Sequence, residues 1–163
     1  MKKRVFTAYT DGGFDMNSCI GASAVVILTP DLKERLYEHV TARKCEYDPT
    51  KKQRTNEQEL GAMIRAVMSV PNGSEILIIS DSQYAVKVLS KENNASANLD
   101  LIARFDKEVS ERCLKVKFKW VRGHNGDLWN ERADQLCQTA MSIIAKTNEK
   151  KKTWKTYNKC YEY

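Results

Sequence analysis

The sequence is poor in the features that mark membrane-spanning and secreted proteins. No apolar run approaches the roughly 20 residues that a membrane-spanning helix requires. The N-terminus, MKKRVFTAYTD, lacks the apolar segment of a signal peptide. These absences exclude an integral membrane protein and predict a soluble, cytoplasmic chain that does not act at a membrane.

Cysteine occurs without the spacing of a metal site. The five cysteines, at positions 19, 45, 113, 137 and 160, include no CxxC pair and no cysteine–histidine pair at zinc-binding spacing. Their odd number and wide separation also argue against a disulfide framework. We therefore predict reduced cysteines that are mostly buried as small hydrophobic side chains.

The positive charge is concentrated at one end of the chain. In total, 27 lysines and arginines against 21 aspartates and glutamates give a net charge of +6 and a pI near 9.0. Residues 146–163 carry six lysines and two glutamates, so they account for +4 and the rest of the chain for +2. Since 42% of the residues are hydrophobic, we predict one globular domain, 1–146, and a basic, aromatic tail, 147–163. The basic balance favours a polyanionic partner.

Hydrophobic periodicity predicts a mixed α/β fold. Alternation predicts antiparallel strands, and apolar residues three or four apart predict helices. A continuous apolar run at 75–80 is typical of a strand covered on both faces. In chain order we expect strands at 4–10, 20–29 and 33–45, a helix from about 55, the strand at 75–80, helices at 82–89 and about 98–112, a strand at 115–121, and a helix at 128–146. Lysines alternate along the strand at 115–121, so we expect one of its faces to be exposed to solvent or to contact a polyanion.

Two aspartates stand where predicted strands end. Asp11 follows the first strand and precedes two glycines, and Asp81 follows the apolar strand. Alone, Asp11 is also typical of a turn and Asp81 of a helix cap. If the two strands are parallel neighbours, the carboxylates lie side by side at the carboxyl edge of the sheet, where sites form in open α/β folds.

Two predicted helices add further candidates. Glu57 and Glu59 lie about 200° apart around a helix, so they cannot share one target. Glu59 lies beside the apolar face and is the better site residue, whereas Glu57 is expected to face solvent. Asn130 and Asp134 share one face of the last helix at i, i+4 spacing. His124 comes just before them, in a loop flanked by glycines.

Clustered carboxylates need a neutralising partner. Asp11, Glu59, Asp81 and Asp134 would repel one another and raise each other's pKa unless a cation were bound. Oxygen ligands favour Mg²⁺ or Mn²⁺ over zinc. Two such ions about 4 Å apart form a clamp for in-line displacement at phosphodiesters. In a basic protein, this combination predicts a metal-dependent nuclease.

Four segments together resemble the type-1 ribonuclease H family. They are YTDGG at 9–13, TNEQEL at 55–60, SDSQYAV at 80–86 and WVRGHNGDLWNERAD at 120–134. Their order and spacing match over essentially residues 4–145. The resemblance implies the ribonuclease H-like fold, a five-stranded mixed sheet with helices on both faces. It also implies an endonuclease that cleaves the RNA strand of RNA/DNA hybrids and leaves 3′-hydroxyl and 5′-phosphate ends.

The same resemblance assigns roles to the candidate residues. Asp11, Glu59, Asp81 and Asp134 become the ligands of two Mg²⁺ ions, with Mn²⁺ as a substitute. Asp11 would bridge both ions, and Asp134 would complete the site of the ion that activates water. Glu59 and Asp81 would complete the site of the ion that stabilises the leaving 3′-oxygen. His124 would assist proton transfer or product release without being indispensable.

Hybrid recognition would follow the family pattern of contacts to 2′-hydroxyl groups and the backbone, with little base specificity. Arg54 and Thr55 would hold a phosphate of the DNA strand, and Asn130 would hold the loop or the water network beside Asp134. The full set of substrate-binding candidates is Gly12, Gly13, Asn17, Arg54, Thr55, Asn56, Gln83 and Asn130.

The sequence departs from the family pattern in three places. TNEQEL keeps the Thr-Asn before the glutamate but has one residue fewer than the fuller form of the motif. FDMNSCIGA follows DGG where many relatives have a glycine- and proline-rich loop, and residues 91–113 lack the basic, tryptophan-containing protrusion of many cellular relatives. We expect the tail, with Trp154, Tyr157 and Tyr161 at helical spacing, to compensate in part by docking as a short helix or by stacking near nucleic acid. The alternative is a solvated tail whose aromatic residues pack on the body.

Other functions fit the residues less well. A catalytically silent hybrid-binding module would not need four mutually repelling carboxylates. A transposase or junction resolvase of the wider fold matches these motifs less closely. A reverse-transcriptase domain is disfavoured because the first strand begins close to Met1. We therefore expect a stand-alone, monomeric hybrid endonuclease.

Overall fold

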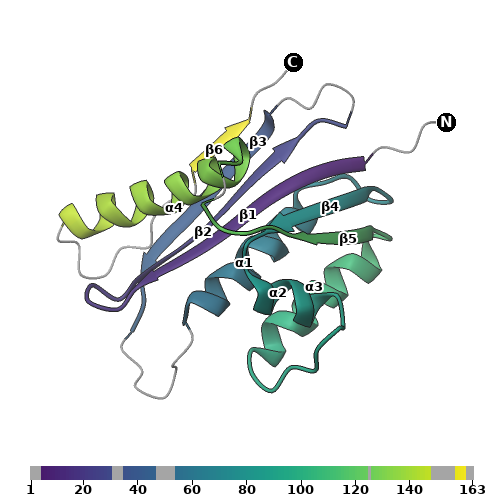
Figure 1. Ribbon diagram of the computed structural model, residues 1–163, viewed down its shortest axis with the longest axis horizontal. Helices are drawn as coiled ribbons and strands as arrows, with labels where there is room; N and C mark the ends of the chain where they lie inside the picture. The colour runs from purple at the N-terminus through teal and green to yellow at the C-terminus, as the bar shows by residue number, and fades with distance from the viewer. Residues whose placement is uncertain (1–4, 31–34, 47–53, 125, 148–156, 161–163) are drawn as a thin grey trace.

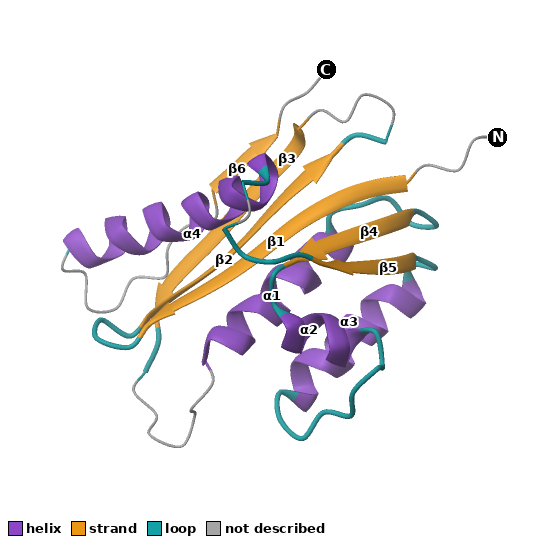
Figure 2. Ribbon diagram, in the orientation of Figure 1, coloured by secondary structure: helices purple, strands orange, loops and turns teal. Residues whose placement is uncertain are grey.

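The mixed sheet expected from the sequence is present in the computed structural model, with helices on both of its faces (Figures 1 and 2). The structure describes residues 5–30, 35–46, 54–124, 126–147 and 157–160. Its elements are β1 (Val5–Asp15), β2 (Ile20–Leu28), β3 (Arg35–Lys44), α1 (Arg54–Met68), β4 (Glu75–Ser80), α2 (Gln83–Leu89), α3 (Leu99–Glu111), β5 (Lys115–Trp120), α4 (Leu128–Lys146) and β6 (Tyr157–Cys160). The strand order is β5-β4-β1-β2-β3-β6. The predicted five-stranded sheet is thus confirmed, and a short sixth strand extends it. No helix in the described ranges is long and apolar enough to cross a membrane.

The two faces of the sheet are covered to different extents. On one face, α1, α2 and α3 enclose the larger core, in which Leu60 and Met63 of α1 are fully buried. On the other face, α4 packs on β1, β2 and β3 through residues such as Cys137 and Ala140. No residue of β4 is exposed, although Glu75 and Leu77 at its start are less completely buried than the rest. The strand is therefore covered on both faces, as expected, and most completely at its carboxyl end.

The first strand does not end at Asp11, as the two following glycines suggested. Asp11 pairs with Ala24 and Gly12 with Ser23, and the antiparallel ladder continues to Asp15. The glycines serve close packing here: a Cβ atom on Gly12 would lie 2.3 Å from the backbone nitrogen of Glu59 in α1. This close approach of β1 and α1 brings Asp11 and Glu59 together.

Gly12→Ala is accordingly expected to lower the free energy of unfolding by about 3 kcal/mol, because the helix backbone must move away to admit the methyl group. Urea unfolding monitored by circular dichroism measures this loss. Gly61→Ala is the matched control, since its added Cβ meets only the Ser23 hydroxyl at 3.3 Å and alanine favours a helix. Equal stability of the two variants would contradict the proposed packing role of Gly12.

The tail reaches the sheet as a strand. Residues Tyr157–Cys160 pair antiparallel with Tyr37–Val40 of β3, the edge strand of the predicted sheet. The helical form suggested by the aromatic spacing is therefore wrong for these four residues, because backbone pairing with an open edge outweighs a weak local pattern. Trp154 and Tyr161 lie outside the described residues. A role of the tail in nucleic-acid binding stays a prediction, as does the domain boundary at 146.

The cysteines differ from expectation in their burial. Cys19, Cys45, Cys113 and Cys137 are free, but only Cys137 is buried. The other three lie at element ends: Cys19 closes the β1–β2 turn and Cys113 follows α3, both with positive φ. The prediction of mostly buried cysteines is wrong because these chain reversals lie at the surface. The side chain of Cys160 is outside the described part of the structure.

Candidate active site

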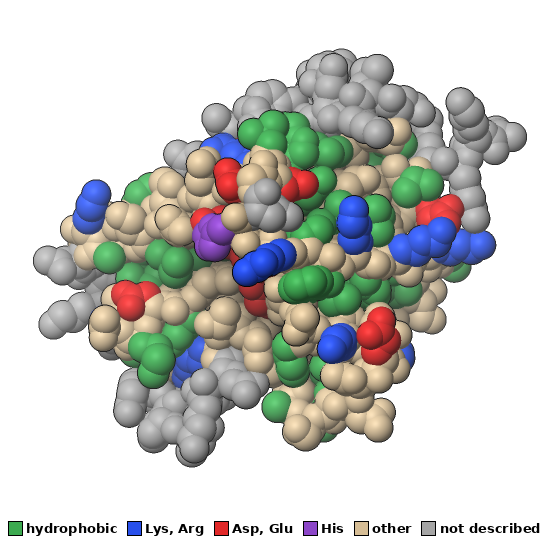
Figure 3. Space-filling model, in the orientation of Figure 1, with side chains coloured by type: hydrophobic (Ala, Val, Ile, Leu, Met, Phe, Trp, Pro, Cys, Tyr) green, Lys and Arg blue, Asp and Glu red, His purple; other side chains and the backbone are tan. Residues whose placement is uncertain are grey.

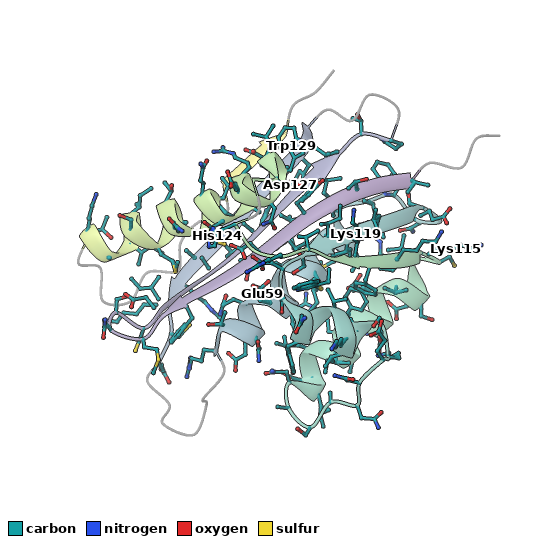
Figure 4. The ribbon with its side chains drawn as sticks, viewed as in Figure 1. Glu59, Lys115, Lys119, His124, Asp127 and Trp129 are labelled. Carbon is teal, nitrogen blue, oxygen red and sulfur yellow. The ribbon has the colours of Figure 1, made fainter. Side chains whose placement is uncertain are left out.

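Four carboxylates from four elements meet at one edge of the sheet. Asp11 lies in β1, Glu59 in α1, Asp81 directly after β4 and Asp134 in α4. Oxygen atoms of Asp11, Glu59 and Asp81 all lie within 4.8 Å of one another. Burial raises the pKa of both Asp11 and Asp81, and Asp134 lies close enough to this group for its charge to raise them further. Figure 4 labels Glu59 near the centre of the view and His124 above it, in the loop that leads to α4. The structure thus brings together the acids that the sequence selected.

Strand pairing explains why Asp11 and Asp81 are neighbours. The parallel ladder between β1 and β4 ends at Tyr9 and Ile79, and each aspartate stands two residues further along its strand. The backbone carbonyl of Asp81 accepts a hydrogen bond of 2.9 Å from the indole nitrogen of Trp120. This contact fixes the chain where it leaves β4, so the position of Asp81 depends on β5 as well.

Burial and mutual repulsion dominate the electrostatics of the cluster. Burial, followed by the charges of Asp81 and Asp134, raises the pKa of Asp11 to about 8. Burial also raises the pKa of Glu59 well above its ordinary value, and the charges of Asp11 and Asp81 act in the same direction. Hydrogen bonds from the Gly12 backbone partly oppose both shifts. In the folded chain without a bound cation, these carboxyls therefore tend strongly to stay protonated.

The loop after β5 lies over Asp81. A Cβ atom on Gly123 would lie 3.0 Å from a carboxylate oxygen of Asp81, so the loop backbone contacts that carboxylate closely. Burial and the charge of Asp134 raise the pKa of Asp81, whereas the charge of His124 lowers it. His124 itself is exposed and has a left-handed backbone, with φ of 55°. Its ring is thus close enough to affect the cluster while remaining open to solvent.

Capping and an ion pair fix the start of α4. The carboxylate of Asp127 accepts hydrogen bonds of 3.0 Å from the backbone nitrogens of Trp129 and Asn130. Arg132 donates two hydrogen bonds, of 2.8 and 3.2 Å, to the buried carboxylate of Glu38 on β3. Both contacts lie within one or two turns of Asp134, so they set its position relative to Asp11. Asn130, predicted to share the face of Asp134, is buried with 4% of its surface exposed.

Sequence reasoning missed two residues at the site. Cys137 lies beneath the acids, and its thiol donates to the backbone carbonyl of Asp11 at 3.6 Å. Burial and the charges of the four carboxylates raise its pKa. Its i, i+3 spacing from Asp134 was the available signal, but Cys137 was counted only among the cysteines expected to be buried. Trp120 was also overlooked, because no local pattern relates it to Asp81.

The substrate-binding candidates fall into two groups. The first group lies near the acids along the chain. It comprises Gly12 and Gly13 in β1, Asn130 in α4, and Gln83, which begins α2 two residues after Asp81. It also includes the first turn of α1 before Glu59, formed by Arg54, Thr55 and Asn56. The guanidinium of Arg54 lies 5.6 Å from the centre of the Phe14 ring, which ties this turn to β1. Asn17 lies apart in the exposed β1–β2 turn, where its backbone nitrogen donates to Asp15.

The residues present fit oxygen-bound divalent cations. One carboxylate oxygen of Glu59, Oε2, is buried and has no hydrogen-bond partner in the structure. The pKa values of all three clustered carboxyls are raised, so a cation would relieve both repulsion and desolvation. A site whose ligands are carboxylate oxygens favours Mg²⁺ or Mn²⁺.

Comparison with known proteins agrees with this geometry. A family model described as RNase H matches residues 3–142. The chain belongs to the RNase H family. It is 32% identical to the ribonuclease H of Anaeromyxobacter sp. (strain K), an alignment that covers 91% of this chain and 86% of the relative. It is 29% identical to the ribonuclease HI of Pseudomonas putida (strain KT2440), covering 83% and 93% of the two chains.

A solved structure supports the fold of this RNase H family member. The N-terminal RNase H domain of a Mycobacterium tuberculosis protein, determined as a fusion with maltose binding protein, matches with a TM-score of 0.71 at 21% identity. The match covers 89% of this chain and 99% of that one. The expected ribonuclease H-like fold, with its five-stranded mixed sheet, is therefore confirmed.

Proposed function

We propose that this protein is an endonuclease that hydrolyses the RNA strand of RNA/DNA hybrids and leaves 3′-hydroxyl and 5′-phosphate ends. The observation that carries the proposal is the cluster of Asp11, Glu59 and Asp81, whose oxygens lie within 4.8 Å of one another in an RNase H family chain. A chain that only bound nucleic acid would gain nothing from buried carboxyls whose pKa values are raised.

The four carboxylates supply the metal ligands in the proposed mechanism. Asp11, Glu59, Asp81 and Asp134 would hold two Mg²⁺ ions, with Mn²⁺ as a substitute. When bound, such ions activate a water molecule for attack on the phosphodiester and stabilise the leaving oxygen. The chain keeps the four carboxylates in place through the contact of Gly12 with α1 and the cap of α4. His124, exposed beside Asp81, would accept or deliver a proton.

The proposed hybrid contacts follow the elements around the acids. Backbone groups of Gly12 and Gly13 and the side chain of Asn56 would contact 2′-hydroxyls of the RNA strand. Arg54 and Thr55, at the start of α1, would hold a phosphate of the DNA strand, where the helix dipole also favours an anion. Gln83 and Asn130 are the remaining candidates near the acids. Asn17 is a weaker candidate because it lies in the β1–β2 turn, six residues beyond Asp11.

A cleavage assay with three labelled duplexes tests this proposal. The protein is incubated with an RNA/DNA hybrid, duplex RNA and duplex DNA, with Mg²⁺ or with EDTA. We expect cleavage of the RNA strand of the hybrid alone, dependent on Mg²⁺, with products that carry 5′-phosphates. Tight hybrid binding without cleavage in Mg²⁺ or Mn²⁺ would instead indicate a silent binding module.

His124→Ala is expected to retain measurable hybrid cleavage, reduced by about 10- to 100-fold, because a metal-activated water does not require a side-chain base. The pH dependence of single-turnover cleavage is the measurement, compared with His39→Gln as the control for the second histidine. His39 is buried on β3, where its ring nitrogens form hydrogen bonds with Tyr37 and Thr41, and it is not part of the carboxylate cluster. Complete loss of activity in a folded His124→Ala protein would contradict the auxiliary role.

A further inference from the structure

Strand β5 presents a row of lysines on the face of the sheet opposite α1. Val116 and Phe118 pack against the larger core, so alternation directs Lys115, Lys117 and Lys119 to the other face. All three side chains are exposed. Figure 4 shows Lys115 and Lys119 at the two ends of this strand. We refer to Lys115, Lys117 and Lys119 as the lysine row.

The lysine row begins two residues along the strand direction from the level of the acid cluster. Lys119 pairs with Ile79, which pairs with Tyr9 of β1. Asp11 and Asp81 each lie two residues beyond these partners, an advance of about 6.6 Å along a strand. From Lys119 the row runs about 13 Å further back along β5 to Lys115. In strand register, the row therefore starts two residues before the carboxylates and runs away from them along β5.

Both acidic and basic side chains lie beside the lysine row, and the three lysines with Arg122 outnumber Glu75 and Asp127. Glu75 lies 3.7 Å from the ammonium of Lys117 and is largely covered, with 12% of its side chain exposed. On the α4 side, burial and then the charge of nearby Asp127 raise the pKa of Tyr9. Arg122, which is exposed, continues the basic surface toward the loop that holds His124. Figure 3 shows basic (blue) and acidic (red) side chains interspersed over the viewed face.

We propose that the lysine row binds the sugar–phosphate backbone of the hybrid beyond the scissile phosphate. The inference rests on the proposed function, because the cluster marks where one phosphate sits. Lysines at every second strand residue recur at about 6.6 Å, a spacing comparable to that of successive phosphates on one strand. Such contacts add affinity without reading sequence. Residues 91–113 are not basic overall. The lysine row thus gives the chain another surface that can bind a polyanion.

Salt-dependent binding of a labelled hybrid tests the row. The variant Lys115→Gln/Lys119→Gln is compared with Lys107→Gln/Lys146→Gln, which removes two exposed lysines from α3 and α4. Fluorescence anisotropy in EDTA, where no cleavage is expected, gives the affinity at several salt concentrations. We expect the row variant to bind about tenfold more weakly at 0.1 M salt. The slope of log affinity against log salt should become shallower by about 1.5, while the control changes neither quantity.

Two further measurements separate the row from the proposed function. In Mg²⁺ the row variant should raise KM for a long hybrid and leave kcat unchanged. A hybrid shortened to the base pairs around the scissile phosphate should bind wild type and variant equally. An unchanged salt slope together with normal cleavage would overturn only the proposed binding role of the lysine row. An altered slope without any cleavage would overturn the nuclease proposal and keep the row as a backbone-binding surface. A protein that binds no nucleic acid would overturn both.

Discussion

Asp11→Asn is expected to lower the rate of hybrid cleavage at least about 1,000-fold, a loss of about 4 kcal/mol of transition-state stabilisation. Asp11 lies close enough to Glu59, Asp81 and Asp134 to interact with them electrostatically, so the amide removes a charge from the centre of the cluster. Single-turnover cleavage of a labelled hybrid in saturating Mg²⁺ is the measurement. Asp106→Asn, at a half-exposed surface ion pair with Lys91, is the control and should cleave within about twofold of wild type. A rate within tenfold of wild type for a folded Asp11→Asn protein would remove this residue from the mechanism.

The same substitution is expected to stabilise the protein when no metal is present. Asp11→Asn removes a buried carboxyl whose pKa is raised to about 8 by burial and by two neighbouring acids. The gain in free energy of unfolding should be about 2–4 kcal/mol at pH 8 in EDTA, where wild type carries the most repulsion. Urea unfolding of both proteins measures it. Equal or lower stability of Asp11→Asn in EDTA would show that the carboxyls are not under electrostatic strain.

The second large effect is a dependence of stability on pH and Mg²⁺. In the folded state Asp11 holds its proton up to about pH 8, whereas an unfolded aspartate releases it near 3.8. The folded state therefore binds more protons between these values, and metal-free stability must fall as the pH rises from about 4 to 8. The raised pKa values of Glu59 and Asp81 add to this fall.

Thermal unfolding between pH 5 and 9 measures this dependence. In EDTA we expect Tm to fall by about 10 °C across the range, and in millimolar Mg²⁺ we expect most of that loss to be recovered. Asp11→Asn should show a flatter profile and a smaller response to Mg²⁺. A metal-free Tm that rises with pH would contradict the electrostatic account of the cluster.

The helices and the acid cluster were predictable because local pattern and motif agree there. The apolar spacing of α4 predicted its bounds, 128–146, and the burial of Cys137, Ala140 and Ile144 confirms the stripe. Glu59 was separated correctly from Glu57 by helical geometry alone, since only Glu59 joins the cluster. In both cases a single element's periodicity determines which side chains face inward.

The failures came where a second element overrides local preference. Two glycines after Asp11 predicted a turn, but pairing with β2 and contact with α1 keep them in β1. Residues Tyr157–Cys160 carry no strand pattern and become β6 only because β3 offers an open edge. The bond from Trp120 to Asp81 likewise joins residues 39 positions apart. Such long-range contacts leave little trace in local sequence.

The central claim is that the buried carboxyls are held together to bind divalent cations. The most direct test is the number of protons released when Mg²⁺ is added to metal-free protein in weak buffer at pH 7. Because the pKa of Asp11 is about 8 before the metal binds, we predict release of about one proton per chain, and less at pH 9. Asp11→Asn should release far fewer protons under the same conditions. Saturating Mg²⁺ that releases no proton from the wild-type protein would contradict the claim.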